Sequence, residues 1–233
     1  MTHPVQAIVQ VAMLEEAQPF LDRAVTVSEP RIVAGVRIFT ADFGTYRITL
    51  AVSGIGLVNA AQAATTLLAE HPHGVPLISA GTAGGVASHT SVGDVIVGVD
   101  IFNLEADAQA FGYQLGQVPG MPTHYESTEA LVDAIRDVAY AHPVRFAGIG
   151  SGDKFVTSDH AHLIRTQFDG IDAVDMESVA IAQVAYRHGS QFVTVRAVSD
   201  LCAPDGTEFL THLDGAAERS ADVVLGALAQ LQR

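Results

Sequence analysis

The sequence predicts one α/β domain built around a mixed β-sheet. Short apolar runs typical of buried strands alternate with segments of helical periodicity, and a strand-rich insert occupies residues 31–53. Of the 233 residues, 48% are hydrophobic and 16% are charged, so the chain has ample material for a core. Because no linker, repeat or low-complexity tract divides the sequence, we expect a single domain over residues 1–233.

The first half of the chain predicts strands and helices in alternation. We expect a buried strand at 6–13, a helix at 15–25, an antiparallel hairpin at 31–53, a helix at 59–70 and a buried strand at 75–80. Phe43 and Gly44 interrupt the insert and mark the turn of the hairpin. The last strand ends in Gly81-Thr82-Ala83-Gly84-Gly85, whose glycines let backbone amides approach a ligand closely.

The second half continues the alternation. We expect a strand at 92–102, a helix at 128–139 capped by Ser127, a strand at 145–151, a helix at 177–186, a strand at 192–198 and a final helix at 215–231. In such sheets ligands bind at the loops beyond the strand ends. The polar residues predicted at those loops are Glu15, Glu16, Thr82, Asp153, Asp175, Glu177 and Asp200.

The composition disfavours several classes of protein. The net charge is −14 and the 12 Lys and Arg residues form no basic stripe, so nucleic-acid binding is disfavoured. No apolar stretch approaches the ~20 residues of a membrane-spanning helix, and residues 1–6 lack the pattern of a secretory signal. The single cysteine, Cys202, is predicted to be a packing residue in a reducing, cytoplasmic setting.

Several segments resemble known binding or catalytic motifs, but each lacks a residue or a spacing that the motif requires. Gly54-Ile55-Gly56-Leu57-Val58-Asn59 lacks the third glycine of a dinucleotide fingerprint and predicts a tight strand-to-helix turn. No Lys-Ser or Lys-Thr follows residues 81–85, as a Walker motif requires. His71-Pro72-His73 and His160-Ala161-His162 lack the spacing of common zinc sites. Gly148-Ile149-Gly150-Ser151-Gly152 is out of register for a nucleophile elbow, which disfavours a serine hydrolase.

Carboxylates near predicted strand ends are the more informative signal. Glu16 follows the first strand, Asp175 and Glu177 stand where another strand meets a helix, and Asp200 follows the strand at 192–198. Any one of them has an ordinary explanation, because the helix dipole favours acidic residues at a helix start. Several of them together in an apolar chain favour general acid–base chemistry on a neutral or cationic small molecule.

Longer segments match one known family. The most telling is Ala110-Phe111-Gly112-Tyr113-Gln114-Leu115-Gly116-Gln117-Val118-Pro119-Gly120. The others are Ala12-Met13-Leu14-Glu15-Glu16, Ser53-Gly54-Ile55-Gly56, residues 81–85, Ser151-Gly152-Asp153-Lys154-Phe155-Val156, Val174-Asp175-Met176-Glu177 and Ala197-Val198-Ser199-Asp200. On these residues the chain, from Ala7 to its end, resembles the 5′-methylthioadenosine/S-adenosylhomocysteine nucleosidases of the purine nucleoside phosphorylase superfamily.

The resemblance implies a fold and two catalytic residues. The fold would be a single-domain three-layer α/β sandwich with a central mixed β-sheet, in a homodimer whose active sites borrow residues from the partner chain. Glu16 would be the base that activates water, and Asp200 the acid that protonates N7 of adenine. The resemblance implies no cofactor and no metal ion, and the expected partners are an adenine nucleoside and water.

The resemblance also implies the residues that bind substrate. They are Thr82, Gly84, Phe155, Val156, Met176, Glu177 and Ser199. Phe155 would stack on the base, the Val156 backbone would read its edge, and Ser199 would support the catalytic aspartate. Glu177, next to Met176, would accept hydrogen bonds from the sugar hydroxyls. Phe111 and Pro119 would reach the 5′-substituent pocket of the partner chain.

These residue types suit the cleavage of an N-glycosidic bond by water. Adenine leaves as a neutral base only if Asp200 carries a proton near pH 7, far above its usual pKa of about 3.9, and a dry apolar site raises that pKa by desolvation. Phosphorylases of the resembled superfamily hold phosphate with arginines near the first glycine loop and before the second. Residues 13–16 and 77–80 occupy those regions here and contain no arginine, so we expect hydrolysis.

The expected function is therefore release of adenine from 5′-methylthioadenosine and S-adenosylhomocysteine, and from 5′-deoxyadenosine, in methionine salvage and the recycling of S-adenosylmethionine by-products. The alternatives are a futalosine or aminodeoxyfutalosine hydrolase, a purine nucleoside phosphorylase and a non-catalytic nucleoside-binding protein. Lys154, Asp175 and the segment 202–209 depart from the pattern of the resembled family, and the departure of 202–209 leaves the preferred 5′-substituent open.

Overall fold

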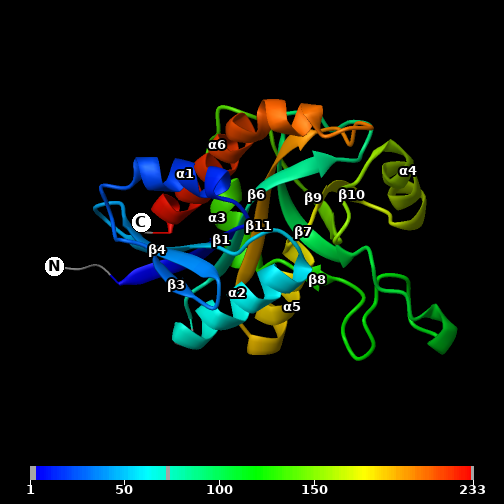
Figure 1. The fold of residues 1–233 in the computed structure, drawn as a ribbon, viewed down its shortest axis with the longest axis horizontal. Coiled ribbons are helices and arrows are strands. Elements are labelled where there is room, and N and C mark those ends of the chain that lie inside the picture. Colours follow the sequence, from blue (N-terminus) through cyan, green and yellow to red (C-terminus); the bar gives the residue numbers. More distant parts are fainter. Residues whose placement is uncertain (1–3, 72–73, 232–233) are drawn as a thin grey trace.

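The computed structural model describes residues 4–71 and 74–231, and one mixed β-sheet runs through them (Figure 1). The strands are β1 (Val5–Val11), β2 (Thr26–Val27), β3 (Arg31–Val33), β4 (Val36–Asp42), β5 (Arg47–Val52), β6 (Leu77–Gly85), β7 (Val95–Asn103), β8 (Tyr125–Glu126), β9 (Val144–Ser151), β10 (Ile171–Asp175) and β11 (Phe192–Asp200). Their order in the sheet is β10-β9-β7-β11-β6-β1-β5-β4-β2, with β3 beside β4 and β8 beside β7.

Helices cover both faces of this sheet. They are α1 (Leu14–Arg23), α2 (Leu57–Glu70), α3 (Glu129–Arg136), α4 (Ser158–Gln167), α5 (Ser178–His188) and α6 (Thr207–Gln230). Side chains alternate along a strand, so Val9 of β1 packs in one core cluster with α1, α3 and α6, and Ile8 packs in another with α2 and α5. The expected three-layer α/β sandwich is confirmed (Figure 1).

Most expected elements are present, but α4, β10 and the two-residue strands β2 and β8 were missed. In α4 only Ala161 and Ile164 are buried, so its sequence carries little helical periodicity. In β10, Asp172 and Asp175 interrupt a short apolar run, although both aspartates are buried by the fold. Ion pairs and hydrogen bonds within the tertiary structure, rather than apolar pattern, hold these residues in place.

Several expected boundaries were wrong. β6 continues to Gly85 instead of ending at residue 80, because its glycines pair with both β11 and β10. Helix α6 begins at Thr207, eight residues before the expected start at 215. Ser127 does not cap α3, because Thr128 holds the N-cap position and Ser127 Oγ donates to the Gly98 carbonyl.

The end of β6 gathers residues from three strands. β6 pairs in parallel with β1 and β11 and, near its C-terminal end, antiparallel with β10. Asp200 and Val174 both pair with Gly84. A Cβ on Gly84 would lie 2.9 Å from Cys202 Sγ and 3.3 Å from Asp200 Oδ1, so this close approach depends on glycine.

A long excursion over residues 104–124 leaves the body between β7 and β8 (Figure 1). It carries a 3₁₀ turn at Gln109–Phe111. The Phe111 side chain is 84% exposed there.

Candidate active site

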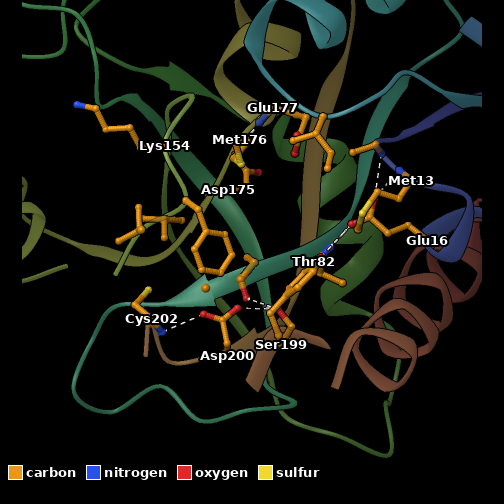
Figure 2. A pocket seen from close by; sticks show the side chains of 18 residues that line it. Met13, Glu16, Thr82, Lys154, Asp175, Met176, Glu177, Ser199, Asp200 and Cys202 are labelled. Carbon is orange, nitrogen blue, oxygen red and sulfur yellow. Dashed lines mark hydrogen bonds between the residues drawn. The ribbon is translucent and has the colours of Figure 1, made fainter. Parts of the chain in front are cut away.

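A cavity of about 150 Å³ opens where β1, β10 and β11 end beside β6 (Figure 2). The residues that line it are Ala12, Met13, Glu16, Ile55, Thr82, Ala83, Gly84, Lys154, Phe155, Val156, Val174, Asp175, Met176, Glu177, Ser199, Asp200, Cys202 and Phe209. All the catalytic and substrate-binding residues that the sequence led us to expect within this chain are among them. Carboxylates are thus set into largely apolar walls, as in many small-molecule sites.

Glu16 lies in the first turn of α1 and its carboxylate is held by four hydrogen bonds. Oε2 accepts the N–H groups of Ala12 at 2.9 Å and Met13 at 3.1 Å. Oε1 accepts the N–H of Thr82 at 2.8 Å and the Thr82 hydroxyl at 3.0 Å. The side chain is buried, and a helix start suits a negative charge. These donors fix the orientation of the carboxylate toward β6.

Asp200 stands at the C-terminal end of β11 and is held by its chain neighbours. Oδ1 accepts the Cys202 N–H at 2.9 Å, and Oδ2 accepts the Ser199 hydroxyl at 3.0 Å. Burial raises the pKa of Asp200; the hydrogen bonds from Cys202 and Ser199 oppose the rise, and the Glu208 carboxylate adds to it. Cys202 is buried, as expected of a packing residue, and its backbone also serves this aspartate.

Glu177 immediately precedes α5 and is buried beside the cavity. Its Oε1 accepts the Gly56 N–H at 3.0 Å, and its Oε2 lies 3.4 Å from Arg196 Nη1. Burial raises the pKa of Glu177 to about 7, while Arg196 lowers it and the charges of Asp175 and Glu16 raise it further. Burial therefore favours the protonated form of this carboxyl, and Arg196 opposes that effect.

Arg196, which the sequence analysis did not single out, lies behind these carboxylates. Its side chain is 1% exposed. Nε lies 2.9 Å from Asp175 Oδ2, and Nη2 donates to Ser79 Oγ at 2.8 Å. Asp175 also accepts the Ser151 hydroxyl at 2.5 Å, which makes Ser151 a structural partner. The sequence did contain a sign of this buried ion pair, because Arg196 stands inside the apolar run 192–198 and a buried charge requires a buried counter-charge.

Phe155 and Phe209 form an apolar wall of the cavity. Their rings meet edge to face with centroids 6.1 Å apart, and Phe155 is about half exposed. Val156 beside them is buried. Lys154 is at the rim, where its ammonium lies 3.8 Å from the Glu105 carboxylate. Figure 2 shows the Lys154 side chain pointing away from the labelled carboxylates.

Other residues singled out in the sequence lie outside the cavity. Phe111 and Pro119 are exposed on the 104–124 excursion of this chain. Asp153 lies on the expected loop beyond β9, whose next residues, 154–156, line the cavity, and its Oδ1 accepts the Leu57 N–H at 2.8 Å at the start of α2.

The histidine pairs have simple placements. His160 and His162 are two positions apart on α4 and do not share a face of the helix. His71 ends α2, and His73 lies outside the described residues. Near β7 and β8, the residues Asp100, His124 and Glu126 bring potential ligand atoms within 4.8 Å of one another, and none of the three lines the cavity.

A family model described as the phosphorylase superfamily matches residues 6–229 of this chain. The match spans nearly the whole sheet and the cavity. The chain belongs to the phosphorylase superfamily. The resemblance seen in the sequence thus agrees with a family match that extends over nearly all of the described residues.

Two relatives of this chain carry the same name. The 5′-methylthioadenosine/S-adenosylhomocysteine nucleosidase of Geobacillus kaustophilus is 35% identical over 232 residues, which cover 96% of this chain and 97% of the relative. The nucleosidase of the same name from Haemophilus ducreyi is 38% identical over 84% of this chain and 86% of the relative. The predicted kinship with nucleosidases, and with it an N-glycosidic hydrolase, is confirmed.

Solved structures of the superfamily share the sandwich. The Neisseria meningitidis nucleosidase, in complex with methylthio-immucillin-A, matches with a TM-score of 0.91 and 32% identity over 97% of this chain and 100% of that chain. The futalosine hydrolase of Helicobacter pylori matches with a TM-score of 0.89 and 26% identity over 97% and 98% of the two chains.

Proposed function

We propose that this chain hydrolyses the N-glycosidic bond of 5′-methylthioadenosine and S-adenosylhomocysteine, and of 5′-deoxyadenosine, releasing adenine and, from the thioethers, the 5-thioribose. One observation carries the proposal. Asp200, whose pKa is raised by burial, and Glu16, whose carboxylate is held by four donors, line the same apolar cavity (Figure 2). An acid and a base held apart on one cavity suit cleavage of a glycosidic bond.

Asp200 supplies the proton in the proposed reaction. Because its pKa is raised, its carboxyl keeps a proton to higher pH than an aspartate in water. Ser199 Oγ lies 3.0 Å from Asp200 Oδ2 and 3.2 Å from the Ala83 carbonyl oxygen. It can donate to Ala83 while Asp200 is protonated and to Asp200 once the proton has moved. Transfer of this proton to N7 lets adenine leave as a neutral base.

Glu16 activates the nucleophile in the proposed reaction. Its carboxylate takes a proton from water as the water oxygen bonds to C1′ of the sugar. The electron pair of the breaking C1′–N9 bond goes to adenine, which has accepted the proton from Asp200. Ala12, Met13 and Thr82 hold the base in place before substrate arrives, so little reorganisation is needed.

The remaining cavity residues bind the nucleoside in this proposal. Glu177 accepts the ribose hydroxyls, beside Met176, and its negative charge stabilises the oxocarbenium-like sugar of the transition state. Phe155 stacks on adenine and the Val156 backbone reads the edge of the base. The residues assigned to the sugar-side strand are Thr82 and Gly84.

The charge around the cavity supports hydrolysis rather than phosphorolysis. None of the 18 described residues that line the cavity is an arginine. The nearby Arg196 is buried and already paired with Asp175 and Glu177. Lys154 is at the rim, with Glu105 as its neighbour. A phosphate dianion beside Glu16 would therefore meet no arginine from the lining, so we propose water as the nucleophile.

We further propose a cytoplasmic homodimer of one domain, 1–233, acting in methionine salvage and S-adenosylmethionine by-product recycling. Phe111 and Pro119 would complete the 5′-substituent pocket of the partner chain, since they are exposed and outside their own cavity. The net charge of −14 disfavours nucleic acid. Among the residues that the structure describes, no helix has the length and apolar character to cross a membrane.

A futalosine-type substrate is the second candidate. The observation that favours it is the match to the Helicobacter pylori futalosine hydrolase, whose TM-score of 0.89 approaches the 0.91 of the Neisseria meningitidis nucleosidase. The proposed acid and base would serve either nucleoside, because the bond broken is of the same kind. Identity favours the first candidate, at 32% against 26%.

The test measures free adenine released from 5′-methylthioadenosine in phosphate-free buffer, by chromatography. We expect rapid release by the wild type, none above background by Glu16→Gln, and normal release by the control Glu15→Gln, which changes the exposed neighbour in the same turn. Nucleoside binding by Glu16→Gln should persist. Normal turnover by Glu16→Gln would remove its role as base.

The same assay separates the alternatives. Release of adenine only after phosphate is added would identify a phosphorylase. Faster release from futalosine or aminodeoxyfutalosine would favour the second candidate. Tight nucleoside binding without release under any of these conditions would identify a binding protein.

A further inference from the structure

Charged side chains are buried together behind the wall of the cavity. Glu16, Asp175, Glu177 and Arg196 are 2%, 7%, 4% and 1% exposed, respectively. Arg196 is the single cation of this group, so three carboxylates share one buried positive charge. Buried charges are tolerated only with close partners. The carboxylate that lies closest to the guanidinium therefore determines how much of this positive charge the other two carboxylates experience.

Asp175 is fully occupied by partners within the protein. Oδ1 accepts the Ser151 hydroxyl at 2.5 Å and the N–H groups of Glu177 at 3.2 Å and Ser178 at 3.1 Å. Oδ2 accepts the Ser178 hydroxyl and lies 2.9 Å from Arg196 Nε. Four hydrogen-bond donors and the guanidinium thus surround this carboxylate, and all of them belong to the protein. Asp175 thus joins β9, the start of α5 and β11.

Arg196 is held more closely by Asp175 than by Glu177. The distances are 2.9 Å from Nε to Asp175 Oδ2 and 3.4 Å from Nη1 to Glu177 Oε2. Nη2 donates to the Ser79 hydroxyl at 2.8 Å, and Nη1 lies 3.4 Å from the Thr82 carbonyl oxygen. The guanidinium is thus held through Nη1 and Nη2 by Thr82 and Ser79, and Asp175 is its nearer counter-charge, in an ion pair without a hydrogen bond from Nε.

We propose that Asp175 is a positioning residue for the reaction assigned above: it anchors the Arg196 guanidinium and the first turn of α5, and so leaves the Glu177 carboxylate available for the sugar hydroxyls. The inference rests on the proposed function, in which Glu177 binds the ribose. Asp175 acts through Arg196 and Glu177. Without the charge of Asp175, the guanidinium closes on Glu177 and occupies the oxygens that the sugar requires.

The pH dependence of kcat/KM reports this arrangement. Glu177 is faced by Arg196 from β11, Asp175 from β10, Glu16 from α1 and the Gly56 N–H before α2. Burial raises its pKa to about 7. Asp175→Asn removes a negative charge that raises the pKa of Glu177. It also frees the Arg196 guanidinium, which lowers the pKa of Glu177, so both effects lower that pKa. The acid limb of kcat/KM then moves to lower pH by about one pH unit.

The experiment measures kcat and KM for adenine release against pH in the wild type, Asp175→Asn, Asp175→Glu and a matched control, Asp172→Asn. Asp172 is on the same strand, is also 7% exposed and pairs with Arg145 at 3.1 Å, but does not line the cavity. We expect Asp175→Asn to lower kcat by roughly tenfold or more and to move the acid limb. Asp175→Glu, which keeps the charge, returns the limb toward its wild-type position, and Asp172→Asn leaves it in place.

An unmoved limb in Asp175→Asn, or an equal shift in Asp172→Asn, would overturn the positioning role. If Asp175→Asn does not fold, Arg196→Lys carries the test. A single ammonium stays with the nearer Asp175, so Glu177 loses its cation and the acid limb moves to higher pH. A limb that stays in place or moves down in Arg196→Lys overturns the inference.

A second measurement separates this inference from the proposed function. The Glu177 carboxyl is followed by ¹³C NMR in glutamate-labelled protein without substrate, with Glu177→Gln assigning the signal. If no nucleoside yields adenine but Glu177 titrates at lower pH in Asp175→Asn, the electrostatic positioning holds and the proposed function fails. If the wild type is active and the Glu177 titration is unchanged in Asp175→Asn, the positioning role alone fails.

Discussion

Gly81 shows how tightly single residues are packed around the site. Its φ is +148°, in a region that other residues rarely adopt. A Cβ there would lie 2.4 Å from Glu16 Oε1 and 2.8 Å from Arg196 Nη1, closer than real Cβ atoms come to their neighbours. The absence of a side chain at this position thus lets a carboxylate and a guanidinium approach the same point of β6.

We predict that Gly81→Ala displaces Glu16 from Thr82. The new methyl group adds strain of roughly 1–3 kcal/mol, and a displaced base lowers kcat/KM by about 100-fold. Urea unfolding and the adenine assay measure the two effects. The control is Gly215→Ala in α6, where a Cβ meets no atom within 4 Å; it should raise stability by roughly 0.5–1 kcal/mol and leave activity unchanged. Wild-type activity in Gly81→Ala would contradict the packing argument.

Glu177 makes stability depend on pH in a predictable direction. Its folded pKa of about 7 lies above the ordinary value of 4.5, so the folded state keeps a proton that the unfolded chain releases. Stability is therefore lost as pH rises from 4.5 to 7. The difference corresponds to on the order of 3 kcal/mol.

We predict that Glu177→Gln removes this loss, because glutamine does not titrate. Urea unfolding at pH 5 and pH 8 should show a smaller decline for the variant than for the wild type. Glu15→Gln, which changes an exposed glutamate, should decline as the wild type does. Equal declines for Glu177→Gln and the wild type would mean that Glu177 is not the group responsible.

At the scale of elements, α6 ties the two central strands of the site together. Ser220 Oγ on this helix donates to the Val195 carbonyl of β11 at 2.9 Å and accepts the Gly81 N–H of β6 at 3.0 Å. Both partners and the serine are buried. The backbone N–H of Gly81 points toward α6 and binds Ser220. This hydrogen bond fixes the position of β6 relative to α6 next to Thr82.

We predict that Ser220→Ala destabilises the protein by about 1–3 kcal/mol, because a buried N–H and a buried C=O lose their partner together. Thermal unfolding measures the loss, and kcat/KM should fall with it as β6 shifts. The control is Thr211→Ala in the exposed first part of the same helix, where the change should stay within about 0.5 kcal/mol. Equal stability of the two variants would show that the helix does not hold β6 through this serine.

At the scale of the whole molecule, the 104–124 excursion is directed away from the sandwich (Figure 1). It carries Phe111, which is 84% exposed. The cavity, in turn, is open beside Phe155 and Phe209, both apolar. An exposed aromatic residue on one copy and an open apolar rim on another are complementary, which supports the proposed homodimer.

We predict that Phe111→Ser weakens this association. Light scattering after size exclusion should show a larger share of monomer, and KM for the nucleoside should rise because the 5′-pocket loses an apolar contact. Val25→Ser is the control, since Val25 is also highly exposed, at 72%, but lies outside the excursion. A wild type that is monomeric at assay concentrations and fully active would contradict the dimer.

Sequence reasoning reached the fold class and the cavity residues, and it failed at particular elements for physical reasons. Periodicity located β1 and β11 within a few residues, because most of their apolar side chains are buried. It missed β10, whose aspartates are satisfied by Arg145, Ser151 and Arg196 from other strands. Because these partners come from other strands, the sequence of β10 alone does not show that its aspartates are paired.

What the sequence alone determined was the class of fold, through the alternation of apolar strands and helices, and the kinds of chemical group available to the site. The tertiary structure decided which groups act on one another. Thr82 reaches Glu16 across 66 positions of sequence, and Gly56 reaches Glu177 across 121. The raised pKa values of Asp200 and Glu177 and the pairing of Arg196 with Asp175 depend on burial and on distances of a few ångströms. Electrostatic interactions are set by those quantities, which only the folded chain defines.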